Sequence, residues 1–264
     1  MSVQGFWADL PTPDFRALPG DTVAVLPLGA TEQHGPHLPL SVDSDLIDAV
    51  AARMLGNLSP DQSVLVLPSL HITKSDEHID FPGTLTLGAE TLLAVLRDIG
   101  ASVARAGVAR LVLLNGHGGN TALLQIVARD LRIAHGLIVV TCSWGGFTEW
   151  QDLYDPAGYV HDIHAGDSET SAMLALRPDR VRMDKAQDFR PAMTDWETGF
   201  PQIGLAGKPA NPGWMAQDLH SLGACGNAAA ATAEKGAQLL DSAGRNFAAF
   251  LAEFARFDHR KDVQ

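Results

Sequence analysis

Four short runs of apolar, largely β-branched residues recur along the first part of this 264-residue chain, at 23–28, 64–67, 111–114 and 137–141. Each run is nearly continuous and does not alternate with polar residues. Such runs are typical of parallel strands that are buried on both faces. The pattern therefore predicts a parallel sheet in the core of the protein.

The segments between these runs, at 44–55, 89–106 and 121–135, have apolar residues spaced as on one face of a helix. Strands that alternate with helices predict right-handed crossovers, which place helices on both faces of one sheet. We therefore expect an α/β fold with a mostly parallel central sheet. No repeat, low-complexity tract or linker divides the chain, which predicts a single domain over residues 1–264.

The second part of the chain is less regular. We expect a loop at 145–164, a helix at 168–176 and a long last helix from Ala228 to about Phe257. The stretch 187–226 is rich in Gly, Pro and polar residues and holds Trp196 and Trp214. Its length without periodicity predicts a binding loop or a subunit-contact arm.

Composition and charge argue against several classes of protein. The formal net charge is −12 and no basic stripe is visible, which argues against a nucleic-acid partner. Only Cys142 and Cys225 are present, without a CxxC spacing, so neither a disulfide framework nor a thiolate zinc site is indicated. No apolar run reaches the roughly 18 residues that span a bilayer. Residues 1–9 also lack a leader pattern, so we expect no membrane partner and a cytoplasmic location.

A first polar cluster follows the run at 23–28. It offers the carboxylate of Glu32, the imidazole of His34 and a second carboxylate at Asp43. Ligands of open α/β folds bind at the carboxyl edge of the sheet, where this cluster is expected to lie. Carboxylate and imidazole groups are ligands that Zn²⁺, Mn²⁺ and Fe²⁺ accept.

A second cluster, Asn115-Gly116-His117-Gly118-Gly119-Asn120, follows the run at 111–114 at the same predicted edge. The glycines allow close approach of the backbone, and His117 lies in a tight turn. A phosphate-binding loop is the alternative interpretation, since Gly-rich turns before helices bind anions. The cluster contains neither GxxxxGK[ST] nor GxGxxG, which weakens that alternative.

A third cluster spans 161–171 and contains His164 in a loop and Glu169 near the start of a helix. Asp167 and Ser168 are interpreted as helix-starting residues that favour the helix dipole. Glu169 is interpreted as a metal ligand, because its helix starts at the same sheet edge as the other clusters. The three clusters suit two metal ions that share a bridging carboxylate, and the imidazole of His164 is left for acid/base work.

The three ordered motifs, together with Glu77-His78 and Phe81-Pro82-Gly83-Thr84-Leu85-Thr86, resemble the creatininase (creatinine amidohydrolase) family over roughly residues 20 to 245. The resemblance implies a three-layer α/β/α domain, usually assembled as a hexamer, with a dinuclear metal site that hydrolyses non-peptide C–N bonds. It implies that Glu32, His34, Asp43 and His117 are metal ligands, with Asp43 bridging. His164 matches the imidazole credited with proton transfer.

Two positions depart from true creatininase. That enzyme has a metal-binding glutamate two residues after the histidine of the second motif, where this chain has Gly119. It also has a tryptophan four residues before the catalytic histidine, where this chain has Val160. Glu169 is therefore the expected replacement ligand, and creatinine is not the expected substrate. Relatives with the same His-Gly-Gly-Asn form include formylamino-pyrimidine deformylases and the peptidase-like member of the mycofactocin pathway.

Other polar residues receive more modest expectations. Gly118, Gly119, Asn120, Glu77 and His78 are candidate substrate-binding residues, and His78 could instead contact a neighbouring subunit. His37 is expected to pack in its loop or support a ligand, and Lys74-Ser75-Asp76 to form a solvated loop. His71 and His135 are expected to be structural, and the tryptophans to lie in the core or an interface.

The sequence thus predicts a hydrolase of a small-molecule amide, cyclic amide or formamide that uses two divalent ions, with zinc preferred over manganese or iron. A water whose pKa the ions lower is expected to bridge them and to attack the carbonyl carbon. A homohexamer is the expected assembly. The alternatives are a peptide-maturation hydrolase of the mycofactocin type, an inactive small-molecule binding protein, and a dinuclear phosphoesterase. A phosphoesterase would need a basic side chain to bind the phosphate, and the three clusters contain no Lys or Arg.

Overall fold

A computed structural model describes residues 2–205 and 207–259, so residues 1, 206 and 260–264 of the predicted domain lie outside the described part. Five parallel strands form the central sheet in the order β1-β3-β2-β4-β5. Their bounds are Gln4–Phe6 (β1), Val23–Leu28 (β2), Val64–Val66 (β3), Arg110–Asn115 (β4) and Ile138–Ser143 (β5). The predicted parallel sheet is confirmed, and β1 is an edge strand that the apolar runs did not reveal.

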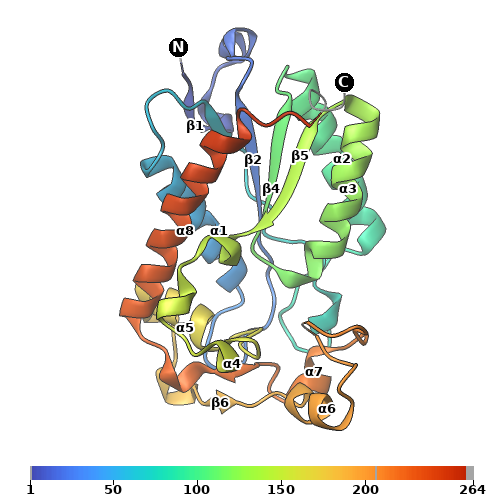
Figure 1. Ribbon diagram of the computed structural model, residues 1–264, viewed down its shortest axis with the longest axis vertical. Helices are drawn as coiled ribbons and strands as arrows, with labels where there is room; N and C mark the ends of the chain where they lie inside the picture. The colour runs from blue at the N-terminus through green and yellow to red at the C-terminus, as the bar shows by residue number, and fades with distance from the viewer. Residues whose placement is uncertain (1, 206, 260–264) are drawn as a thin grey trace.

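Helices cover both faces of the sheet (Figure 1). One face carries α1 (Val42–Gly56) and α8 (Ala233–Phe254), and the other carries α2 (Ala89–Arg105) and α3 (Thr121–His135). Alternate residues of each strand face opposite layers: Val23 and Val25 of β2 pack on the α1/α8 side, and Ala24 and Leu26 pack on the α2/α3 side. These two apolar cores make the three-layer α/β/α architecture.

Shorter elements surround the carboxyl edge of the sheet, in the lower half of Figure 1. They include α5 (Asp167–Leu176), which packs against α1 and α8. The others are α4 (Pro156–Tyr159), β6 (Asp188–Phe189), α6 (Met193–Gly199), α7 (Ala216–Leu219) and β7 (Gly226–Asn227). The segment expected to be irregular at 187–226 therefore contains short helices and one strand of an antiparallel pair, β6 with β7.

Two helix starts differ from the sequence prediction by two residues or more. The last helix begins at Ala233 and not at Ala228, because Thr232 is extended and its side chain accepts a hydrogen bond from the N–H of Lys235 as an N-cap. Residues Ala228–Ala230 form a separate 3₁₀ turn. The first helix begins at Val42, which places Asp43 in its first turn. Among the described residues, no helix is long and apolar enough to cross a membrane.

Candidate metal centre

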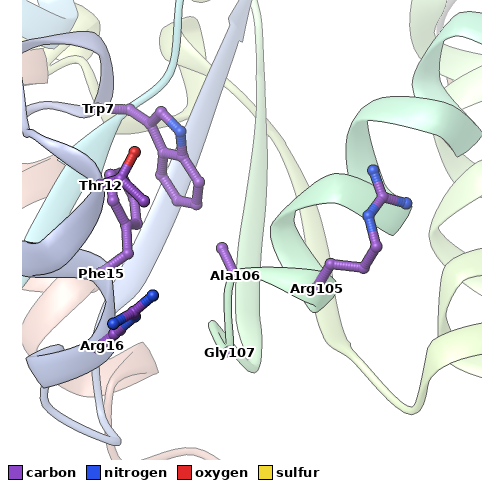
Figure 2. Close-up of a pocket in the computed structure, with 7 residues that line it drawn as sticks. All are labelled: Trp7, Thr12, Phe15, Arg16, Arg105, Ala106 and Gly107. Carbon is purple, nitrogen blue, oxygen red and sulfur yellow. The ribbon is translucent and has the colours of Figure 1, made fainter.

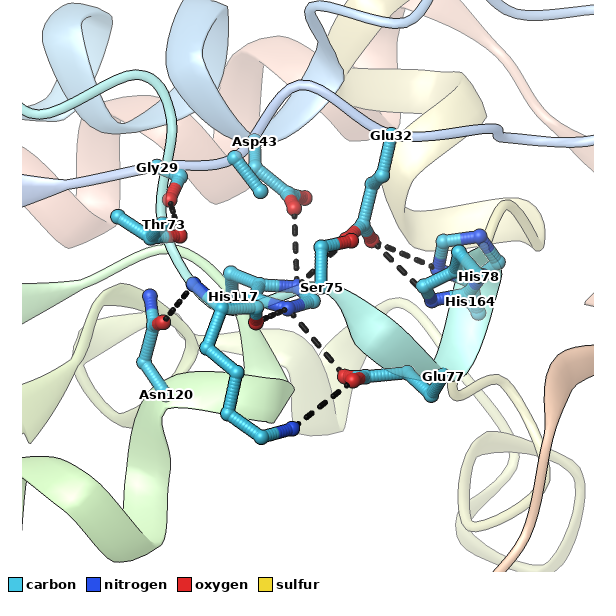
Figure 3. Close-up of polar contacts among 12 residues, drawn as sticks. Gly29, Glu32, Asp43, Thr73, Ser75, Glu77, His78, His117, Asn120 and His164 are labelled. Carbon is cyan, nitrogen blue, oxygen red and sulfur yellow. Dashed lines mark hydrogen bonds and ion pairs between the residues drawn. The ribbon is translucent and has the colours of Figure 1, made fainter. Parts of the chain in front are cut away.

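The polar clusters of the sequence meet at the carboxyl edge of the two central strands (Figure 3). Glu32 and His34 lie in the segment after β2, and His117 follows the neighbouring strand β4. Asp43 enters from the first turn of α1, and Glu169 from the first turn of α5. Parallel neighbouring strands end at the same edge, which is why residues 85 positions apart, such as Glu32 and His117, come into contact.

Asp43 stands between two imidazoles. Its Oδ1 lies 3.3 Å from Nε2 of His34, and its Oδ2 lies 3.2 Å from Nδ1 of His117. The two carboxylate oxygens therefore face different nitrogen donors. This is the arrangement expected of a carboxylate that bridges two positive centres.

Glu32 and Glu169 complete two groups of possible ligands on either side of Asp43. Glu32 Oε2 lies 3.1 Å from His117 Nδ1, and Glu169 Oε2 lies 3.7 Å from His34 Nε2. One set of mutually close donor atoms is Glu32, Asp43 and His117, and another is His34, Asp43 and Glu169. A third set, Glu32, His34 and His164, overlaps both.

Backbone carbonyls fix which nitrogen each imidazole presents. The Nδ1–H of His34 donates to the carbonyl oxygen of Glu32 at 3.1 Å, and the Nε2–H of His117 donates to that of Lys74 at 2.8 Å. The other nitrogen of each neutral ring is then a free acceptor that faces the carboxylates. Metal-bound histidines are held in the same way, with the outer N–H on a carbonyl or carboxylate.

Burial without hydrogen-bond partners also fits a metal. Within the described residues, Oε1 of Glu32, Nε2 of His34 and Oδ2 of Asp43 are buried and have no hydrogen-bond partner. Glu32 and His34 are 0% exposed and Asp43 is 2% exposed. Buried polar atoms are costly to leave unpaired, so three such atoms facing one another indicate a site built for a cation.

The electrostatics of the ligand cluster follow from its carboxylates. Burial alone would lower the pKa of His34, but Asp43, Glu169 and Glu32 raise it to about 9. Burial would also lower the pKa of His117, but the nearby carboxylates, mainly those of Glu32 and Asp43, raise it well above its usual value. Burial would raise the pKa of Asp43, yet the two imidazoles hold it below its usual range. Without a metal ion, the imidazoles of His34 and His117 therefore bind protons, and this positive charge balances the carboxylates.

Glu169 has a local anchor. Its Oε2 accepts a hydrogen bond from the N–H of Ala165 at 2.6 Å, and Ala165 adopts a left-handed φ of 54°. The side chain of Asp162 accepts hydrogen bonds from the N–H groups of Asp167 and Ser168 and so fixes the start of α5. Burial raises the pKa of Glu169 to about 7.

The Gly-rich turn has a specific steric cause. A Cβ at position 119 would overlap Oε1 of Glu77 and Nε2 of His117, whereas a Cβ at position 118 would meet no atom within 4 Å. Asn120 is buried, and its amide bonds the N–H of Lys74 and the side chain of Asn115. Substrate binding by Gly118, Gly119 and Asn120 stays a prediction.

Two more histidines line the cluster. His164 Nδ1 lies 3.7 Å and His78 Nε2 lies 3.4 Å from Glu32 Oε1, and the two rings stack with centroids 4.4 Å apart. Burial lowers the pKa of both rings, that of His164 most clearly. The roles predicted for them, proton transfer and substrate binding, are compatible with these positions.

Sequence reasoning missed two residues of this centre. Ser75 was expected in a solvated loop, but it is 0% exposed and its hydroxyl donates to Oε2 of Glu32. That expectation was wrong for Ser75 because the loop folds inward over the strand ends; its neighbour Asp76 is exposed. Gln33 lies between two predicted ligands and contacts both His78 and His164. The position of Gln33, a polar residue between the predicted ligands Glu32 and His34, could have indicated its role in the site.

His37 and three of the tryptophans behave as packing residues, whereas His71 and His135 are exposed. His37 is buried, stacks on Phe189 and contacts Thr170 Oγ1 at 2.9 Å. Trp144 lies in the main core, and Trp196 and Trp214 pack against the small cluster around Met193. An additional role of these tryptophans in subunit contacts stays a prediction.

A surface depression of about 490 Å³ lies at the other, amino edge of the sheet (Figure 2). Trp7 and Phe15 from the first residues of the chain line it, together with Arg16 and Arg105. Among the described residues that line this depression, none carries an imidazole or a carboxylate. It therefore shares no residue with the metal-ligand cluster.

Comparisons with known proteins agree with this geometry. The family model described as Creatininase (creatinine amidohydrolase) matches residues 8–251. The creatinine amidohydrolase of Pseudomonas putida is 37% identical over 243 residues, which cover 86% of this chain and 87% of that protein. The mycofactocin precursor peptide peptidase of Mycobacterium ulcerans is 38% identical over 183 residues, which cover 67% of this chain and 68% of that protein.

Solved structures extend the likeness to the fold. A mutant creatininase of the Zn–Zn type superposes with a TM-score of 0.73 at 32% identity, and a manganese form of creatininase with a TM-score of 0.72 at 32% identity. Each match covers 97% of this chain and 100% of the solved chain.

Proposed function

The chain belongs to the creatininase family of hydrolases, and from this premise we propose that it is a dinuclear metal-dependent amidohydrolase that acts on a non-peptide C–N bond. The bond would belong to an amide, a cyclic amide or a formamide of a small molecule. The observation that carries the proposal is Asp43, whose two oxygens face the imidazoles of His34 and His117.

The donor atoms support two cation positions. Glu32, Asp43 and His117 would hold one ion, and His34, Asp43 and Glu169 would hold the other. Nitrogen and oxygen donors of this kind suit zinc, which we propose as the native metal, and also manganese or iron. The zinc and manganese forms among the similar creatininase structures support the same choice.

His164 would move the proton of the reaction. When bound, two divalent ions supply a water of lowered pKa and a Lewis acid for the substrate carbonyl oxygen. The water oxygen forms a bond to the carbonyl carbon, while Nδ1 of His164 accepts the water's proton. The C–N bond then breaks, and the same proton passes from His164 to the departing nitrogen, so the products are a carboxylic acid and an amine. Proton transfer matters here because an amide anion is a poor leaving group.

The two departures from creatininase support a substrate other than creatinine. Position 119 has no side chain, and Val160 stands where that enzyme has a tryptophan. The Val160 side chain is 42% exposed and offers no aromatic face to a planar ring. We therefore propose a different small amide as the substrate.

A mycofactocin-type peptidase is the second candidate function. The identity of 38% to the Mycobacterium ulcerans peptidase supports it, because that relative acts on a precursor peptide. The same ligands and the same proton carrier would serve a peptide bond. The two candidates differ in the size of the substrate and not in the chemistry.

We also propose a homohexamer, to which 187–226 contributes subunit contacts, and no nucleic-acid or membrane partner. Exposed apolar side chains support a covered surface: Ile79 follows His78, Leu85 bonds the backbone of Thr31, and Phe200 lies in 187–226. Light scattering at micromolar concentration tests the assembly, and a fully active 28.1 kDa monomer would refute it. The cytoplasmic location stays a prediction.

A substrate panel tests the function. The zinc-loaded protein is assayed for release of ammonia or amine from simple amides, lactams and formamides, with short peptides as the second arm. Asp43→Asn is the inactive control, and Asp48→Asn, which changes a carboxylate that pairs with His71 outside the cluster, is the matched active control. Hydrolysis of peptides alone would favour the second candidate, and no hydrolysis in either arm would refute both.

A further inference from the structure

Two stacked imidazoles, His78 and His164, lie beside Glu32, and the side chain of Gln33 touches both rings. Gln33 and the two histidines are buried. Only His164 has a role in the proposed reaction so far. The hydrogen bonds of Gln33 decide what His78 presents to the site.

The amide of Gln33 has a fixed orientation. Its Oε1 accepts a hydrogen bond from the N–H of Gly35 at 2.9 Å. Nε2 must therefore be the atom that faces the carbonyl oxygen of Gly223 at 2.8 Å and Nδ1 of His78 at 2.7 Å. Gly223, at a φ of +74°, leaves room for this amide, because a Cβ there would overlap it.

The backbone of Gln33 fixes His164. Its carbonyl oxygen can only accept, and Nε2 of His164 lies 2.8 Å away, so this nitrogen donates. It then cannot also accept from Nε2 of Gln33, which lies 3.1 Å away. The two amide protons of Gln33 therefore go to the Gly223 carbonyl and to Nδ1 of His78.

The two rings consequently carry their proton on the same nitrogen but present opposite edges to the site. His78 directs its Nε2–H toward Glu32 Oε1, whereas His164 directs the lone pair of Nδ1 toward the same oxygen. One ring presents an N–H to the cluster, and the other presents a lone pair.

We propose that Gln33 is a positioning residue that makes His78 a hydrogen-bond donor to the substrate carbonyl oxygen and leaves His164 as the proton acceptor. This inference rests on the proposed amide hydrolysis. Negative charge develops on the carbonyl oxygen during attack, and a preoriented N–H donor stabilises it. His78 would then stabilise the carbonyl oxygen, and His164 would accept the proton.

The protonation pattern is tested by ¹⁵N solid-state NMR of the zinc-loaded protein with labelled histidine, with signals assigned from His78→Gln and His164→Gln. We expect Nδ1 of His78 to be unprotonated in the wild type and protonated in Gln33→Glu, whose carboxylate can only accept. Nε2 of His164 should stay protonated in both, because it bonds a backbone carbonyl. A protonated Nδ1 of His78 in the wild type, or an unchanged one in Gln33→Glu, would overturn the inference.

The kinetic arm uses two substitutions of His78. His78→Leu removes the donor and should lower kcat by ~10²–10³-fold, as loss of one such donor does elsewhere. His78→Gln places an amide N–H near the former Nε2 and should retain more of kcat, while His71→Leu at the surface is the control. Equal kcat for His78→Leu and the wild type would overturn the donor role. A wild type inactive on every amide, with the NMR pattern as expected, would refute the function and leave the hydrogen-bond assignment standing.

Discussion

Glu77 fills the space beside Gly119. Its Oε1 lies 3.3 Å from Nε2 of His117, the ring nitrogen that faces away from Asp43, and a Cβ at position 119 would overlap this oxygen. Burial would raise the pKa of Glu77, but its contacts with His117 and Lys74 hold it below its usual range. The Glu77 carboxylate thus contacts the ring nitrogen of His117 that does not face the candidate metal site. It leaves no room for a glutamate at position 119.

The first prediction follows from this contact. Gly119→Ala should displace Glu77 or His117 and destabilise the protein by about 1–3 kcal/mol, the usual cost of overpacking. Gly118→Ala is the matched control, because its Cβ would meet no atom within 4 Å. Thermal unfolding of the two variants measures the difference. Equal melting temperatures would mean that the turn relaxes freely.

The second prediction separates a ligand from its support. Glu169→Gln should lower the metal content from two ions per chain to about one, since its Oε2 faces His34 Nε2. Glu77→Gln should keep two ions at saturating metal but weaken affinity by ~10–100-fold, the usual effect of an outer hydrogen-bond partner. Elemental analysis and competition with a chelator measure these quantities. Unchanged stoichiometry in Glu169→Gln would reduce Glu169 to a hydrogen-bonding role.

The third prediction concerns proton transfer. His164→Ala should retain its fold and metal content but lower turnover of the true substrate by ~10²–10⁴-fold. Amides with poor leaving groups should lose most, because they depend most on protonation of the nitrogen. His135→Ala, at the exposed end of α3, is the control. Loss of metal in His164→Ala would instead make His164 a ligand, as its group with Glu32 and His34 also permits.

The fourth prediction is the pH dependence of the metal-free protein. The pKa of His34 is raised from 6.5 to about 9, and that of His117 is also raised. A raised imidazole pKa contributes stability that is fully present below 6.5 and is lost as the pH rises through the folded value. The melting temperature of the metal-free protein should therefore fall between pH 7 and pH 9. Saturating zinc should abolish this fall, because ions replace the protons. A melting temperature of the metal-free protein that rises between pH 7 and pH 9 would show that these two imidazoles are not stabilised as cations.

Much of the fold was readable from the sequence because buried parallel strands leave continuous apolar runs. The β2 run was predicted to the residue, and α3 had the predicted bounds. Edge strand β1 was missed because its three residues are partly exposed and carry no such run. The start of α8 was missed because Ala-rich residues before Thr232 look helical until the cap is seen.

The site was predicted through motif residues, and its supporting contacts were not. Ser75 and Gln33 contact residues that are distant in the sequence: Ser75 bonds Glu32, 43 positions away, and Gln33 contacts His164, 131 positions away. No periodicity in the chain records such contacts. The overlap between Gly119 and Glu77 is likewise a property of two loops in space.

We propose that two divalent ions lie on either side of Asp43. Elemental analysis measures the number of zinc ions per chain in the purified wild-type protein, after it is saturated with zinc and then exchanged into metal-free buffer. We expect two ions per chain, both lost in Asp43→Asn. One ion or none in the wild type, or two retained in Asp43→Asn, would contradict it.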